Sequence, residues 1–391
     1  MPDHLREILR FCESQSAWVR ETVETLVRLE SPSDDKAAVD RCGATLARML
    51  QEVGADVTRS TQAARGDHLR ARWPADGRDA RGRQTLLLGH FDTVWPAGTL
   101  ERMPLREGDG RLYGPGIFDM KSGLAVSLLA IRALGEVAGG TSRVALLWTT
   151  DEEIGSGTSR ALIEDTARAS RAVLVLEPSL PGGGVKTSRK GVGEFELLVH
   201  GVSAHAGLDP GKGASAIHEL ARQILALEAL QDPARGVTVN VGVISGGSRS
   251  NVVADRAAAR IDVRVQTMED AVRVERAIQA LQPTRTNIRF EIRGGVDRPP
   301  LERSSAVVRL YERAREVAAV LGQDLPEGPA GGGSDGNFTA AIGVPTLDGL
   351  GPRGDGAHAA HEHVIIDDLA WRAAFVTGLI ESLDSSVQLE A

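Results

Sequence analysis

The sequence has few cysteines, few aromatic residues and no long apolar segment. Its two cysteines, Cys12 and Cys42, cannot build a disulfide framework, and neither belongs to a Cys-x-x-Cys metal-binding motif. The most apolar long stretch, residues 124–134, contains Ser127 and Arg132 and is much shorter than the ~20 residues that cross a membrane. The N-terminus carries charges where a signal peptide needs an apolar core. We therefore expect a cytoplasmic protein without a transmembrane helix.

An excess of positive charge is also missing. The 391 residues include 45 Lys and Arg against 53 Asp and Glu, which gives a formal net charge of -8. This acidic balance argues against nucleic acid or an anionic membrane as the main partner. The hydrophobic share of 42% and the charged share of 25% are ordinary for a globular protein, and the length favours two domains.

Three short apolar runs predict buried parallel strands at residues 85–88, 144–148 and 172–176. Helix-like segments at 122–134 and 161–169 connect them, so the pattern is βαβαβ. We expect an α/β fold with a mixed, mostly parallel sheet flanked by helices.

A second domain is expected from residue 190 onward, where the pattern changes. Alternating polar and apolar residues predict antiparallel strands, and amphipathic periodicity predicts two helices on one face of their sheet. The strands are expected at 194–199, 259–265 and 287–292, and the helices at 215–230 and 272–281. The interpretation is an inserted α+β domain over residues 190–299, with 1–189 and 300–391 forming the catalytic α/β domain.

Acidic residues and one histidine follow the three apolar strands directly. His90 and Asp92 come after the first strand, Glu152 and Glu153 after the second, and Glu177 after the third. Ligands in open α/β sheets bind at the carboxyl ends of the strands, so these side chains are expected at one edge. Adjacent acids repel one another, and a buried glutamate is costly unless it is paired or binds a metal.

Two further segments add candidate ligands. Asp119 lies in a glycine-flanked turn at a helix start, where alone it would be an ordinary N-cap. A histidine cluster near the C-terminus contains His358, His361 and His363. Together with the acids at the strand ends, these residues form a mixed nitrogen and oxygen set that suits a divalent metal, zinc first.

Seven short motifs follow one another along the chain. They are GHFDTV (89–94), GPGIFDMKSG (114–123), TDEEIGSG (150–157), EP (177–178), GVSAHAG (201–207), GGGSDG (331–336) and GAHAAHE (356–362). In this order they resemble the dinuclear-zinc amide hydrolases, a family that includes bacterial glutamate carboxypeptidases, aminoacylases and succinyl-diaminopimelate desuccinylases. The motif sequences are most similar to those of the glutamate carboxypeptidases of the carboxypeptidase G type.

The resemblance implies two zinc ions per chain, with cobalt or manganese as possible substitutes. It assigns His90 and Glu177 to one zinc and Glu153 with His358 to the other. Asp119 would bridge the two ions and be followed by a cis peptide bond.

The resemblance also implies the catalytic residues. Asp92 would orient His90, and Glu152 would be the general base. His205 in the inserted domain would reach the active site of the partner subunit and stabilise the tetrahedral intermediate. The inserted domain would therefore act as a lid and as the contact of a homodimer.

Substrate-binding roles are implied for Arg298, Asn251 and Ser334, with the arginine suited to a substrate carboxylate. In the C-terminal motif, His358 followed by Glu362 fits the family spacing, and His361 is the alternative ligand.

The implied function is hydrolysis of an amide or peptide bond that releases a C-terminal amino acid from a small N-acyl or peptidyl substrate. The runner-up is an aminoacylase, which selects the acyl side. A serine hydrolase is a remote alternative, because Ser334, Asp355 and His358 follow the nucleophile-elbow order, although no buried strand is expected before the elbow. A metal- or peptide-binding protein without activity is disfavoured, because no ligand and no general base is missing.

Overall fold

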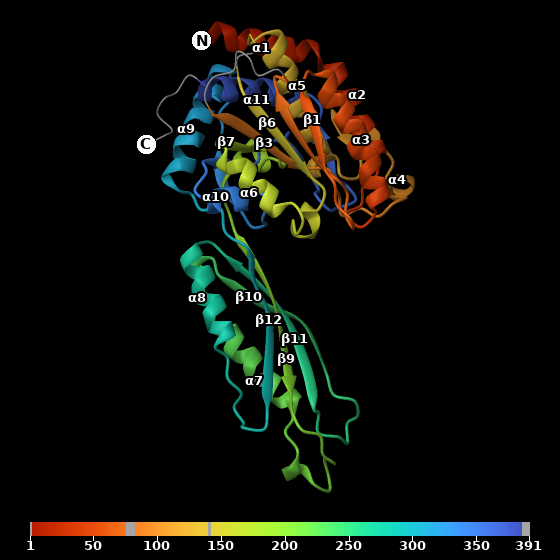
Figure 1. Ribbon diagram of the computed structural model, residues 1–391, viewed down its shortest axis with the longest axis vertical. Coiled ribbons are helices and arrows are strands. Elements are labelled where there is room, and N and C mark those ends of the chain that lie inside the picture. The colour runs from red at the N-terminus through yellow and green to blue at the C-terminus, as the bar shows by residue number, and fades with distance from the viewer. Residues whose placement is uncertain (1, 76–82, 140–141, 385–391) are drawn as a thin grey trace. The chain divides into compact units, whose positions relative to one another are not determined.

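The computed structural model describes residues 2–75, 83–139 and 142–384, which fold into two compact units (Figure 1). Unit 1 comprises residues 1–188, 303–330 and 334–391, and unit 2 comprises residues 189–302 and 331–333. Within the described ranges, every helix is too short or too polar to cross a membrane.

Unit 1 contains a six-stranded, mostly parallel sheet. In spatial order its strands are β1 (Asp56–Ser60), β2 (His68–Trp73), β6 (Val144–Thr149), β3 (Gln84–His90), β7 (Ser170–Val175) and β14 (Thr346–Leu347). β6, β3, β7 and β14 run parallel, and β2 pairs antiparallel with both β1 and β6. The predicted mostly parallel sheet is confirmed, whereas the sequence did not predict the β1–β2 hairpin.

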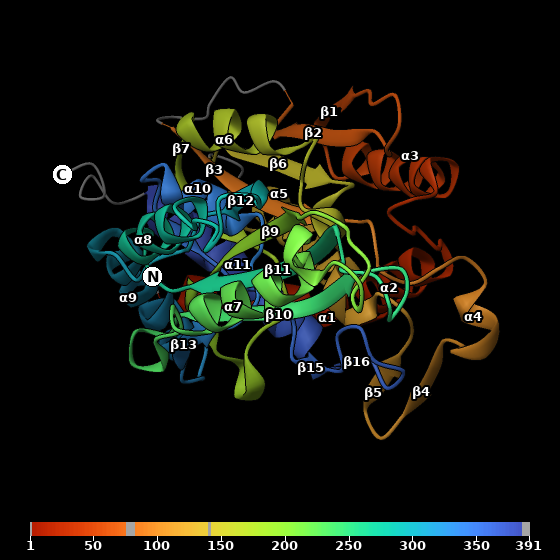
Figure 2. The same ribbon diagram turned by 90° about the horizontal axis from the view of Figure 1, so that it is seen from below.

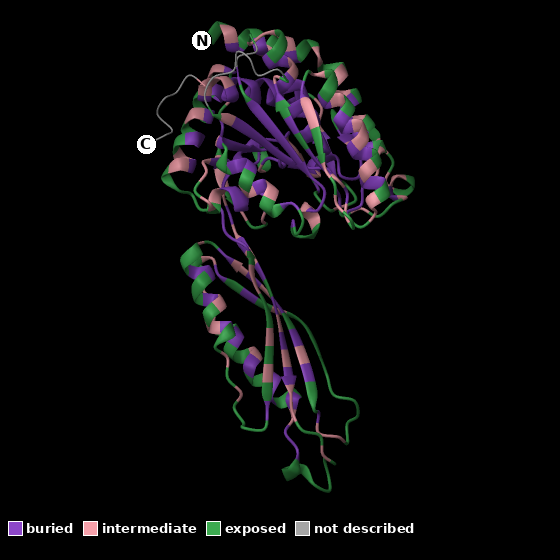
Figure 3. Ribbon diagram, in the orientation of Figure 1, coloured by how far each residue is buried: buried purple, intermediate pink, exposed green. Residues whose placement is uncertain are grey.

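Both faces of the central part of this sheet are covered, which explains why β3, β6 and β7 are buried nearly throughout (Figure 3). Successive side chains of a strand point to opposite faces. Leu87 therefore joins one core cluster, while Leu86 and Leu88 join another. The helices of the first cluster are α1 (Pro2–Ser14), α2 (Ser16–Arg28), α3 (Lys36–Glu52), α5 (Ser122–Glu136), α9 (Ser305–Val320) and α11 (Asp368–Asp384). Those of the second are α6 (Arg160–Arg168) and α10 (Gly336–Ala341).

Short strands complete unit 1. A small antiparallel sheet has the order β15 (Gly354–Asp355), β16 (His363–Ile365), β5 (Arg111–Tyr113) and β4 (Arg106–Gly108). β8 (Val185–Arg189) pairs with β13 (Glu327–Ala330), and α4 (Thr99–Arg102) is a single turn. The pairing of β16 with β5 brings the histidine-containing loop 356–362 next to the segment that leads into α5.

Unit 2 is a four-stranded antiparallel sheet with two helices. The strand order is β10 (Thr238–Gly246), β11 (Arg256–Val265), β9 (Gly191–His200) and β12 (Arg289–Arg298). α7 (Ala216–Glu228) and α8 (Met268–Gln279) pack on one face of the sheet (Figure 1, Figure 2). In β9 buried and less buried residues alternate, as its sequence pattern predicts. The sequence did not predict β10.

Two glycines allow the start of α5 to approach the strand ends. A Cβ atom on Gly123 would lie 2.0 Å from the carbonyl oxygen of Leu176, and one on Gly89 would lie 2.7 Å from the side chain of Met120. A larger residue at Gly123 would therefore collide with backbone. This close contact places the turn before α5 beside the ends of β3 and β7.

Candidate metal centre

The strand register brings the predicted side chains to one edge of the unit 1 sheet. Leu88 on β3 pairs with Val175 on β7, so His90 and Glu177, each two residues further on, lie at the same level. His90 pairs with Thr149 on β6, and the short turn η2 (Glu152–Ile154) follows that strand. The parallel sheet therefore delivers one histidine and the acidic side chains of two neighbouring chain segments to one place.

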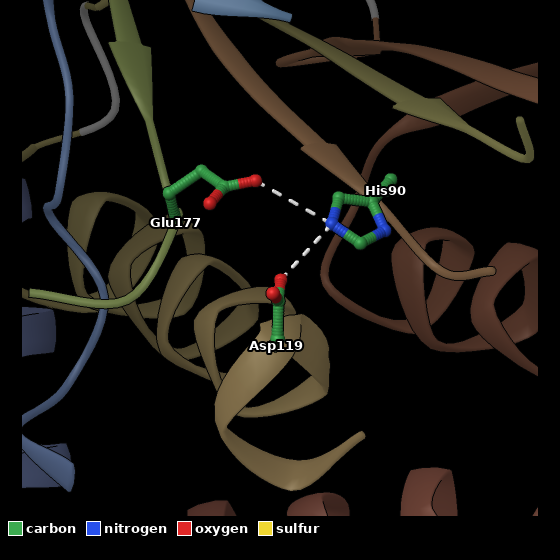
Figure 4. A group of neighbouring side chains, drawn as sticks. All are labelled: His90, Asp119 and Glu177. Atoms are coloured by element: carbon green, nitrogen blue, oxygen red, sulfur yellow. Dashed lines mark hydrogen bonds and ion pairs between the residues drawn. The ribbon is translucent and has the colours of Figure 1, made fainter. Parts of the chain in front are cut away.

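Asp119 lies between two histidines. Its Oδ1 is 3.3 Å from Nε2 of His90, and its Oδ2 is 3.3 Å from Nε2 of His358. Nε2 of His90 is also 3.4 Å from Oε1 of Glu177 (Figure 4). Nε2 of His358 is 3.2 Å from Oε2 of Glu153. The two oxygens of one carboxylate thus serve two separate clusters, each with a histidine and a second acid.

The donor atoms in both clusters fit a divalent metal. Each cluster offers one imidazole nitrogen and two carboxylate oxygens, which leaves a position open, as in catalytic zinc sites. Tetrahedral zinc with bonds of about 2.0–2.1 Å separates its ligand atoms by about 3.3–3.4 Å, which agrees with the N–O distances here. Oε1 of Glu153 is buried and has no hydrogen-bond partner in the described part of the chain, so it is free to bind a cation.

The electrostatics of the clusters favour positive charge. Contacts with Asp119 and Glu153 raise the pKa of His358 to about 10. Burial disfavours the imidazolium of His90, but the carboxylates in contact with it raise its pKa well above the usual value. Burial alone would raise the pKa of Asp119, yet the two histidines lower it, whereas burial raises the pKa of Glu153. Protons would therefore compete with a metal ion for these side chains.

Asp92 connects the first cluster to the turn with the adjacent glutamates. Its carboxylate lies 3.4 Å from Nδ1 of His90, and Ser33 donates a hydrogen bond to it at 2.8 Å. The backbone N–H groups of Glu152 and Glu153 also donate to Asp92, at 3.4 and 3.2 Å. Asp92 is fully buried, so it holds His90 and the glutamate turn in fixed relative positions. Glu153 belongs to the second cluster, and Glu152 belongs to neither.

Comparison with known proteins gives the family. Residues 86–382 match peptidase family M20/M25/M40. The chain belongs to this family. It is therefore a metal-dependent hydrolase that acts on amide bonds.

Relatives of the family cover almost the whole chain. Carboxypeptidase G2 of Pseudomonas sp. (strain RS-16) is 31% identical over 93% of this chain and 89% of its own. A succinyl-diaminopimelate desuccinylase of Pseudoalteromonas atlantica is 28% identical over 92% of this chain and 97% of its own. The structure of aminopeptidase PepT from Bacillus cereus has the same fold, with a TM-score of 0.77 at 23% identity over 94% of this chain and 98% of that one.

The loop that carries His358 has an unusual backbone conformation. His358 has a φ of +61°, in the left-handed region that few residues other than glycine adopt, and such residues cluster at functional sites. The peptide bond between Asp119 and Met120 is cis, as the family resemblance implies. His361 is exposed and lies in neither cluster, so the geometry favours His358 as the histidine of the second cluster.

The sequence predicted no function for one buried acid next to the site. Glu362 is fully buried, and its carboxylate accepts hydrogen bonds from the backbone N–H groups of Gly116, Phe118 and Asp119. Burial raises its pKa to about 7, against the opposing effect of these hydrogen bonds. The only signal in the sequence is its place four residues after His358.

The remaining predicted residues lie outside the two clusters. His205 and Asn251 are close to each other in unit 2, where Ala206 N–H donates to the carbonyl of Asn251 at 3.0 Å. Arg298 ends β12, also in unit 2, and is largely buried. Ser334 belongs to unit 1.

The geometry gives no support to a serine hydrolase. Ser334 is fully buried, and its hydroxyl donates to Asp348 at 2.5 Å. Nε2 of His358 faces the carboxylates of the second cluster. The strand that precedes the glycine loop, β13, is short and only half-buried. A nucleophile elbow needs a buried strand and a serine in contact with a histidine.

Proposed function

We propose that this chain is a dinuclear-zinc hydrolase that releases a C-terminal amino acid, of the glutamate type, from N-acyl amino acids or short peptides. The observation that supports the proposal is the position of the Asp119 carboxylate, whose Oδ1 faces His90 in one cluster and whose Oδ2 faces His358 in the other. The likeness to carboxypeptidase G2 over nearly the whole chain supports the substrate class. Zinc is proposed because of the histidine and carboxylate donors, and cobalt or manganese would fit the same donors.

His90 and Glu177 would hold one ion, Glu153 and His358 the other, and Asp119 both. Two bound ions would activate a water molecule as nucleophile and polarise the scissile carbonyl. Glu152 would take a proton from the attacking water and pass it to the nitrogen of the leaving amine as the C–N bond breaks. The backbone N–H of Glu152 donates a hydrogen bond to Asp92, which would fix the base relative to the two ions.

The hydrogen bonds of His205 suit a role as oxyanion donor. Its Nδ1 accepts hydrogen bonds from the N–H groups of Gly207 and Leu208, each at 3.1 Å. A neutral imidazole with Nδ1 as acceptor carries its proton on Nε2. Nε2–H would therefore be available to donate to the negative oxygen of a tetrahedral intermediate. Asn251, Arg298 and Ser334 are proposed to bind the substrate, with the guanidinium of Arg298 for its carboxylate.

A homodimer through unit 2 is part of the proposal. β10 is an edge strand of its sheet, and its second half is exposed from residue 242 onward. Val243 and Ile244 on this edge are 55% and 64% exposed, and Leu225 on the neighbouring helix α7 is 66% exposed. Exposed apolar edge strands invite pairing with another chain. A second copy that pairs along β10 would cover this surface symmetrically.

An aminoacylase or another N-acyl-amino-acid deacylase is the second candidate. Three succinyl-diaminopimelate desuccinylases, which are 28–30% identical to this chain, favour it. The two candidates cleave the same kind of bond and differ in which side of the amide the enzyme selects.

Assays with a matched panel of substrates test the proposed function. The panel combines several acyl groups with glutamate and with other amino acids, and the released amine is measured. An arginine that holds the carboxylate of the released residue would make turnover depend mainly on that residue, and the resemblance to glutamate carboxypeptidases leads us to expect the highest turnover for glutamate. Turnover that follows the acyl group would identify the deacylase instead, and no turnover of any member of the panel by the metal-loaded protein would contradict both.

The two adjacent glutamates are expected to respond differently to the same change. Glu152→Gln keeps its hydrogen-bonded backbone but cannot shuttle a proton, so turnover falls by about 10²–10⁴-fold while both metals remain bound. Glu153→Gln removes a charged ligand and weakens metal binding. Metal content by elemental analysis and turnover are measured on both variants. Metal loss in Glu152→Gln, with full metal content in Glu153→Gln, would reverse the assignments.

Mixing two inactive variants tests whether His205 acts in the partner subunit. A heterodimer of a His205→Ala chain and a Glu152→Gln chain has one site with an intact Glu152 and an intact partner histidine. After complete exchange of an equal mixture, we expect about one quarter of wild-type activity, since half the dimers are mixed and each has one complete site. No recovery after confirmed exchange, or an active monomer, would show that His205 does not act in trans.

A further inference from the structure

Four hydrogen bonds converge on the buried carboxylate of Glu362. Oε2 accepts from the N–H of Gly116 and from Nε1–H of Trp95, both at 2.8 Å. Oε1 accepts from the N–H groups of Phe118 and Asp119, at 2.9 and 3.0 Å. Both oxygens are thus used twice, and hydrogen bonds to a carboxylate are among the strong ones.

Three of these four donors belong to the backbone turn that carries Asp119. This turn, η1 (Ile117–Lys121), leads into α5, and Asp119 itself has non-helical φ and ψ of -115° and 94°. A residue at the start of a helix is ordinarily held by a nearby side chain. Here the acceptor is 243 residues further along the chain than Asp119, so the turn is ordered by a long-range contact.

Glu362 also belongs to the loop that carries His358. Its N–H donates to the carbonyl of Ala359, and its own carbonyl accepts from the N–H of Gly114, at 2.9 and 3.2 Å. One residue therefore joins the His358 loop to the Asp119 turn through both its side chain and its backbone.

We propose that Glu362 is a positioning residue that fixes how the carboxylate of Asp119 is divided between His90 and His358. The inference deepens the proposed function and rests on it, because the division of Asp119 has its consequence when both clusters bind metal. Partners that orient a metal ligand typically change metal affinity by about 10–100-fold when they are removed.

The variant Glu362→Gln tests this role with little change in size. Its amide nitrogen is a donor and cannot accept from two N–H groups, so two of the four donors lose their acceptor, and at least one of these belongs to the Asp119 turn. We expect the dissociation constants for added zinc or cobalt to rise by about 10–100-fold. The visible absorption spectrum of the cobalt-loaded protein should also change, because it reports the arrangement of the ligands.

Glu219→Gln is the matched control. Glu219 is also fully buried, and it accepts from the N–H of Thr284 at 2.8 Å and from the side chain of Gln223 at 2.9 Å, but it lies in unit 2. Both variants are expected to lower the melting temperature of the metal-free protein. Only Glu362→Gln is expected to change metal affinity and the cobalt spectrum.

A milder variant keeps the test decisive if Glu362→Gln does not fold. Trp95→Phe removes one of the four donors and leaves the three backbone donors in place. We expect about a fivefold loss of metal affinity, as for one hydrogen bond, and a smaller change in the cobalt spectrum.

Normal affinity and an unchanged cobalt spectrum in the folded variants would overturn the role of Glu362. With a wild-type protein that binds two metals, that result would leave the proposed function intact. A wild-type protein that binds one metal would refute the dinuclear proposal, and with it the division of Asp119 that Glu362 is proposed to fix. A wild-type protein that binds no metal would overturn both.

Discussion

Mutual repulsion among buried and partly buried carboxylates is the constraint on which the site depends. Asp119, Glu153 and Glu177 share two imidazoles, those of His90 and His358. Burial makes each negative charge more costly, because water no longer screens it. The carboxylates raise the pKa values of both His90 and His358, so protonated imidazoles balance part of the negative charge when no metal is bound. Divalent ions would balance this negative charge more fully than protons, which agrees with the chain's membership of a family of metal-dependent hydrolases.

The fold meets this constraint by bringing separate segments to one sheet edge. β3 ends at His90, β7 is followed by Glu177, and β6 leads to the glutamate turn. Asp119 arrives from the start of α5, which can approach because Gly123 has no side chain. His358 arrives from a loop of the small sheet. Packing on both faces of the large sheet holds the strand ends, and Asp92 and Glu362 hold the turns between them.

Much of this was predictable from local sequence. Continuous apolar runs identified β3, β6 and β7, and the acids after them identified the sheet edge. Elements stabilised mainly by distant partners were missed, namely the β1–β2 hairpin, β10 and the two- and three-residue strands that support the His358 loop, since so few residues carry no periodic signal. The choice between His358 and His361 also needed the fold, because both lie in one motif and only the loop conformation separates them. For the same reason, nothing local connects Glu362 to the backbone of Asp119.

The central claim, that one carboxylate joins two metal sites, is tested most directly by X-ray diffraction at the zinc absorption edge from crystals grown with zinc. The account predicts two anomalous peaks about 3.5–4 Å apart, with one oxygen of Asp119 directed to each. One peak should lie beside His90 and Glu177 and the other beside Glu153 and His358. A single peak, or a second peak that does not contact Asp119, would contradict the account.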